Sequence, residues 1–169
     1  MKGTSLMANV DTPRALLVMA VQDLYDGECA MVERLDNVRS CLADEAMREL
    51  VEQDTARSGT QREALADIAR ALDAAPDKAE NVWLRAILDD ADNDCTSIVQ
   101  GPLRDIALAG ALRKGKQSQR VSYETALALA CRLDLAEAAE ALGAMIDAAQ
   151  ETDTALARAL TRLSGGVER

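Results

Sequence analysis

The stretch LRKGKQSQRVSYETAL, residues 112–127, interrupts the apolar stripe of a long predicted helix. Between Arg113 and Arg120 it contains no aliphatic or aromatic side chain. Core-facing residues follow three- and four-residue spacing on both sides of this gap, at Ile106, Ala109, Leu112, Tyr123, Leu127 and Ala130. Because a helix that packs on a core normally keeps such a stripe unbroken, the gap predicts a polar layer halfway along a buried helix.

Two other predicted helices lose their stripe at a similar depth. The helix expected over 12–42 carries Glu28 among apolar stripe positions, and the one expected over 44–72 has three polar positions in succession. A fourth long helix is expected over 135–163, and a short one after Pro76 in the connection between the second and third long helices. In an antiparallel bundle, helix midpoints meet at one level. The predicted layer consists of Glu28, Asp54, Arg57, Gln61, Lys116 and Gln119.

Composition agrees with an all-α fold. The chain has 169 residues, 49% of them hydrophobic, but only 2% are aromatic and Phe is absent. The core is therefore built from Ala, Leu, Val, Ile and Met, most of which favour helices. The pattern predicts a ferritin-like four-helix bundle with a long crossover that carries a short extra helix. We expect one domain over 12–163, with flexible termini at 1–11 and 164–169.

Charge and residue usage exclude several function classes. A net charge of −10 argues against nucleic acid as a partner and disfavours anionic membranes. No segment reads as a signal peptide or a membrane span. The chain has no histidine, which removes the common catalytic triads and imidazole metal sites. Four cysteines without a Cys-x-x-Cys pair indicate reduced thiols, and we expect a cytoplasmic protein without a cofactor.

The layer admits three interpretations. Its two carboxylates and two cations cancel, which favours an internal salt-bridge network. Alternatively, Lys116, Arg57 and Asp54 extend to solvent along the bundle surface. The third possibility is a carboxylate-only metal site made by Glu28 and Asp54. The predicted site contains no catalytic residue and no metal ligand beyond these two candidates.

Several motifs resemble one bacterial family. DLYDGE, residues 23–28, resembles the Asp-Leu-Tyr-Asp-Ala-Glu signature of the YciE/YciF-type ferritin-like stress proteins. Further similar segments follow in the family's order, over 101–114, 122–142 and 150–160, so the resemblance spans about 12–163. It implies a ferritin-like bundle that is often dimeric and whose metal-binding members carry glutamates on each helix.

This chain departs from the family's ligand pattern at most positions. The first family glutamate matches Glu28. The second motif places Asp54 at its histidine and Arg57 at its glutamate, and the third places Lys116 and Gln119 at its two glutamates. The fourth ligand position falls on Ala148 or Ala149. We therefore expect a buried Glu28 to pair with Lys116, Arg57 or both, because a cation would balance the charge that a metal balances in relatives.

The chain has three aromatic residues, two tyrosines and one tryptophan. Tyr25 and Tyr123 are expected to be hydrogen-bonded core or interface residues, and Trp83 is expected to pack over the bundle or at a dimer contact.

The favoured function is a non-catalytic structural or interaction protein, a homodimer with an unknown protein partner, linked to stress by the resemblance alone. The alternatives are an oxidative or metal-binding carboxylate protein and a small-molecule carrier that uses a cavity between the helices.

Overall fold

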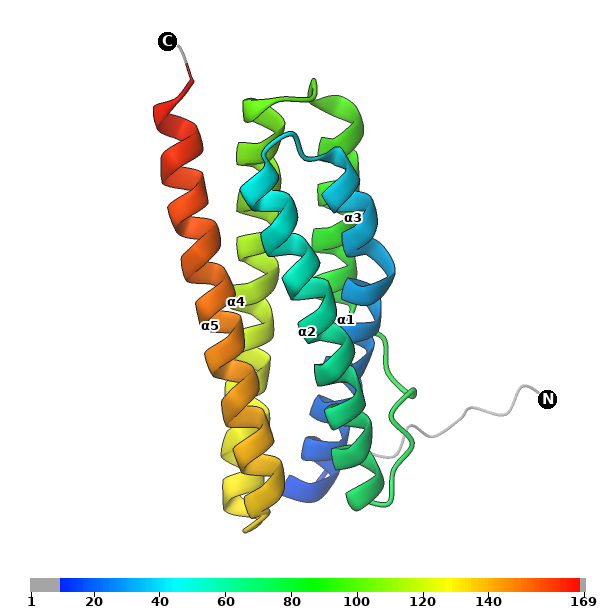
Figure 1. Cartoon of the computed structure of the whole chain (residues 1–169). Helices are drawn as coiled ribbons and strands as arrows, with labels where there is room; N and C mark the ends of the chain where they lie inside the picture. The colour runs from blue at the N-terminus through cyan, green and yellow to red at the C-terminus, as the bar shows by residue number, and fades with distance from the viewer. Residues whose placement is uncertain (1–9, 168–169) are drawn as a thin grey trace, which may run out of the picture.

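Five helices make up the part of the chain that the structure describes, residues 10–167 of a computed structural model (Figure 1). They are α1 (Pro13–Cys41), α2 (Glu45–Ala71), α3 (Val82–Ser97), α4 (Pro102–Arg132) and α5 (Ala136–Gly165). No strand occurs within residues 10–167. The all-α bundle with a short helix in the crossover is thus confirmed.

Local sequence signals set the helix ends. The Thr12 hydroxyl accepts a hydrogen bond from the Ala15 backbone N–H (3.1 Å), and Pro13 occupies the first turn. The Asp44 carboxylate caps α2 in the same way through the Met47 N–H (2.9 Å). The Asn81 amide oxygen caps α3 by accepting from the Leu84 N–H (2.9 Å).

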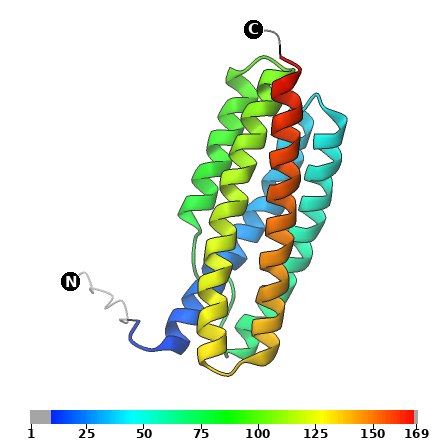
Figure 2. The ribbon, with the colours of Figure 1, turned by 90° about the vertical axis from the view of Figure 1, so that its left-hand side faces the viewer.

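The long helices form two antiparallel hairpins, α1 with α2 and α4 with α5, which pack together through α1 and α4 (Figures 1 and 2). The crossover from residue 72 to residue 81 returns the chain along the bundle before α3 begins. Helix α3 then runs parallel to α1 and lies over the pair formed by α1 and α4. None of the described helices is long and apolar enough to cross a membrane.

Helix α5 extends two residues into the segment 164–169 that was expected to be flexible. Helix α5 continues through Ser164 to Gly165, because the Leu163 side chain is buried and the Ser164 hydroxyl donates to the Leu160 carbonyl oxygen (2.7 Å). The expected flexible residues 1–9, 168 and 169 lie outside the described part of the chain.

The hydrophobic core is divided into two clusters. One cluster contains Met31, Leu35, Val51, Leu112 and Leu156, among others. The second contains Leu24, Leu65, Tyr123 and Met145, among others. On each long helix the chain passes from one cluster to the other near the midpoint, and buried polar residues occupy the level between them.

Candidate functional site

Glu28 lies at the centre of this polar level and has no solvent exposure. Its Oε1 accepts a hydrogen bond from Gln119 Nε2 (2.7 Å) and another from the Tyr123 hydroxyl. Burial raises the pKa of Glu28, while the Lys116 ammonium and the Tyr123 hydrogen bond lower it by less. The site therefore favours the neutral carboxylic acid more than water does.

Lys116 forms a buried ion pair with Asp54. Lys116 Nζ lies 2.7 Å from Asp54 Oδ1, and the two side chains are only 3% and 8% exposed. The expected ion pair between Glu28 and Lys116 or Arg57 is therefore wrong. Asp54 projects from α2 directly onto the ammonium, so Lys116 acts on Glu28 only as a nearby charge.

Arg57 and Gln61 lie outside the buried layer. Arg57 is 41% exposed, and its guanidinium donates to Thr152 Oγ1 (3.2 Å) and Glu151 Oε2 (3.3 Å) on α5. Gln61 is half-buried in a hollow between α2 and α5. The buried stripe of α2 runs through Val51, Asp54 and Ser58 to Leu65. The buried stripe of α2 is thus rotated by about one residue from the predicted stripe near its middle. Ser58, and not Arg57, faces the core there.

The charges in the layer consequently do not cancel. With Arg57 at the surface, the buried charged residues of the predicted layer are Glu28, Asp54 and Lys116. Two ionised carboxyl groups, Glu28 and Asp54, would then face a single buried ammonium. Since an unpaired buried charge is costly, this arrangement raises the pKa of Glu28 and favours its neutral form.

Within residues 10–167, three buried polar atoms at this level have no hydrogen-bond partner: Glu28 Oε2, the Ser58 hydroxyl and Gln119 Oε1. Ser58 was missed because the predicted stripe passes through its neighbour Arg57 instead. Its spacing of four residues from Asp54 was the available signal. On α5 the corresponding level carries Ala149 and Thr152, which are also buried.

Helix α3 covers this level from outside. A Cβ added to Gly27, next to Glu28, would lie 3.1 Å from Leu84 Cδ2, and one added to Gly115, next to Lys116, would lie 3.3 Å from Leu84 Cδ1. The Leu84 side chain of α3 therefore fits between two glycines, one on α1 and one on α4. Gly115 thus permits a close approach of α3 to α4 within the stretch 112–127.

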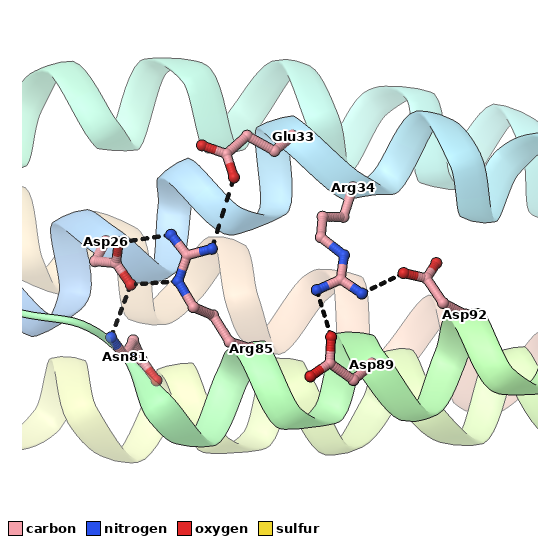
Figure 3. Close-up of polar contacts among 7 residues, drawn as sticks. All are labelled: Asp26, Glu33, Arg34, Asn81, Arg85, Asp89 and Asp92. Atoms are coloured by element: carbon pink, nitrogen blue, oxygen red, sulfur yellow. Dashed lines mark hydrogen bonds and ion pairs between the residues drawn. The ribbon is translucent and has the colours of Figure 1, made fainter.

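Ion pairs hold α3 to α1 along its length (Figure 3). Asp26 accepts from Arg85 Nε (2.8 Å) and Nη2 (2.7 Å) and from the Asn81 backbone N–H (2.7 Å). The Arg85 hydrogen bonds hold the pKa of Asp26 below its usual range. One to two turns further on, Arg34 pairs with Asp89 (2.7 Å) and with Asp92.

The aromatic residues lie in three different environments. Tyr123 is 1% exposed and donates its hydroxyl hydrogen to Glu28. Tyr25 is half-buried, and burial raises its pKa. Trp83 is 79% exposed, so within the described part of the chain it does not pack over the bundle.

A family model described as "Domain of unknown function (DUF892)" matches residues 12–165. The chain belongs to the DUF892 family. Its fold is that of the E. coli stress protein YciF, with a TM-score of 0.88 at 18% identity over 93% of this chain and 99% of that one. YcfI of Rhodopseudomonas palustris, described as a candidate structural protein, gives 0.84 at 16% identity over 89% and 96%. No curated protein sequence matches the chain.

The resemblance to YciF-type proteins, predicted from DLYDGE and the later motifs, is thus confirmed for this DUF892 member. The metal site that the resemblance implies does not fit the residues present. Within residues 10–167, no group of three or more Cys, Asp or Glu side chains converges on one point. Asp54 is bound to an ammonium, and Glu28 is bound to a phenol and an amide.

Proposed function

We propose that this chain is a non-catalytic ferritin-like protein with a structural or interaction role. The observation that carries the proposal is the buried Lys116–Asp54 ion pair, at the level where a metal-binding bundle needs converging carboxylates. An ammonium at hydrogen-bond distance from a carboxylate supplies the positive charge that a metal would otherwise supply. Glu28, the remaining family ligand position, accepts hydrogen bonds from Gln119 and Tyr123 on its Oε1.

Metal content tests this proposal. The full-length protein is incubated anaerobically with ferrous iron, desalted and measured by mass spectrometry, then exposed to air while ferric absorbance is followed. We expect far less than one equivalent of iron and no oxidation above the buffer rate. A stoichiometric, tightly held metal that is lost in Glu28→Gln and Asp54→Asn would instead support the carboxylate metal protein.

A homodimer in the cytoplasm is part of the proposal. Val82 and Trp83 are adjacent in the first turn of α3 and are 65% and 79% exposed, which favours burial of this surface in a partner copy. Four free cysteines favour a reducing compartment. A link to stress is proposed by analogy with YciF, since stress is what that protein's description names.

A second candidate function is carriage of an apolar small molecule. It is favoured by an open hollow of about 660 Å³ between α2 and α5, lined by Ala56, Ala64, Ala141, Ala144 and Ala148, with polar residues at its rim. The probe N-phenyl-1-naphthylamine tests it by fluorescence. The carrier function predicts saturable binding that Ala148→Trp abolishes and that Ala128→Trp, on an exposed position of α4, leaves unchanged.

A further inference from the structure

Two cysteines from separate helices meet where α1 and α3 end. The two helices are parallel, and their polar contacts fix the register: Arg34 pairs with Asp89 and Asp92, and Asn37 Nδ2 donates to Asp92 Oδ1 (2.8 Å). One turn beyond Asn37 and Asp92, the facing positions are Cys41 and Cys95.

The surrounding packing keeps these two residues together. Cys95 belongs to the buried stripe of α3, and Cys41 packs against the same core cluster. Arg104 of α4 joins the two helix ends, since its guanidinium donates to the Ile98 carbonyl oxygen (2.6 Å) and to the Cys41 carbonyl oxygen (3.5 Å).

The environments of Cys41 and Cys95 differ. Cys95 is 9% exposed, whereas Cys41 is half-buried and reachable from solvent. Burial, followed by contact with the Cys41 thiol, raises the pKa of Cys95 to about 12. Both thiols are free in this structure.

We propose that Cys41 and Cys95 are a reversible oxidation site, which a hydroperoxide converts into a disulfide between the C-terminal ends of α1 and α3. In the first step the Cys41 sulfur attacks the O–O bond of hydrogen peroxide. A sulfur–oxygen bond forms, the O–O bond breaks, and the products are a Cys41 sulfenic acid and water. The Cys41 sulfur is oxidised as the peroxide is reduced.

In the second step the Cys95 sulfur attacks the Cys41 sulfur. The sulfur–sulfur bond forms, the sulfur–oxygen bond breaks, and the leaving hydroxide combines with the Cys95 thiol proton as a second water. Overall, two thiols and one hydrogen peroxide give one disulfide and two waters. A small dithiol such as dithiothreitol reverses the reaction by exchange.

Oxidation would tie the crossover helix covalently to the bundle. Helix α3 is otherwise held to α1 by side-chain contacts that water and salt can weaken. The disulfide would close a loop over residues 41–95, which contains all of α2 and most of α3. Closing so long a loop restricts the unfolded chain and stabilises the fold.

Peptide mapping of the full-length protein tests the site. After treatment with hydrogen peroxide and alkylation of remaining thiols, trypsin should release peptides 40–48 and 86–104 joined by a disulfide. We expect the loss of two of the four free thiols, recovery of both with dithiothreitol, and a melting temperature several degrees higher in the oxidised protein.

Matched variants separate this pair from the other thiols. Cys29→Ser/Cys131→Ser should give the same joined peptides, whereas Cys41→Ser, at a half-buried position, should give none. Cys95→Ala provides a second test that keeps the buried position apolar. The proposal is overturned if Cys41 and Cys95 are alkylated or oxidised independently, or if the only disulfides found involve Cys29 or Cys131.

Discussion

Glu28 is a buried acid whose ionisation the protein opposes. Its pKa is raised in the folded state, so the folded protein binds this proton more tightly than the unfolded chain does. The resulting stability is fully present below the unfolded pKa of about 4.3 and is lost as the pH rises through the folded pKa.

Glu28→Gln should therefore stabilise the protein increasingly as the pH rises. The glutamine oxygen can still accept from Tyr123 and Gln119, and no charge needs to be buried. We expect a gain of about 1–2 kcal/mol near neutral pH and a much smaller difference near pH 4. Urea unfolding across this range measures it, with Glu49→Gln as an exposed control. A loss of stability at every pH would contradict the neutral-acid interpretation.

Lys116→Met should be strongly destabilising, because it leaves Asp54 buried without its ammonium. The expected cost is about 3–5 kcal/mol, and Lys116→Met/Asp54→Leu should recover most of it by removing both charges. A double-mutant cycle in urea gives the coupling energy. Additive effects of the two single variants would show that the pair is not coupled.

Sequence reasoning predicted the buried polar level better than its internal pairing. Glu28, Asp54, Lys116 and Gln119 interrupt their stripes and are buried. A shift of one residue in the stripe of α2 exchanges Arg57 for Ser58, and periodicity cannot resolve so small a rotation. Which anion an ammonium contacts depends on side-chain reach within a packed core, which spacing alone does not encode.

At the scale of elements, glycine has a packing role that differs from helix to helix. Gly27 and Gly115 lie against Leu84, whereas nothing would lie within 4 Å of a Cβ added to Gly143 in α5. The starts of α1 and α2 were predicted within one residue, at Thr12 and Asp44. The close contact of α3 with α1 and α4 could not be predicted, because it joins residues far apart in the chain.

This difference gives a matched pair of substitutions. Gly143→Ala should stabilise the protein by about 0.5–1 kcal/mol through helix propensity alone. Gly27→Ala should show no such gain, because its Cβ would lie 3.0 Å from Asn81 Nδ2 and 3.1 Å from Leu84 Cδ2. Thermal unfolding compares the two variants. Equal stabilisation would mean that α3 shifts to accommodate the added methyl group with no loss of stability.

At the scale of the whole molecule, the exposed apolar start of α3 offers a test of the proposed homodimer. If Val82 and Trp83 lie in a dimer interface, Trp83→Glu should raise the dissociation constant at least tenfold, since aromatic residues often dominate such interfaces. Light scattering after size exclusion, over a range of concentrations, measures the mass. Val121→Glu, another exposed apolar position on α4, is the comparison. An unchanged dimer in Trp83→Glu would exclude this surface.

The position of Leu84 between Gly27 and Gly115 also implies an order in which the helices pack. Helices α1 with α2, and α4 with α5, are neighbours in sequence and can pair early because short loops close quickly. The groove that receives Leu84 exists only after α1 and α4 have come together. We therefore expect α3 to dock after α1 and α4 have packed together.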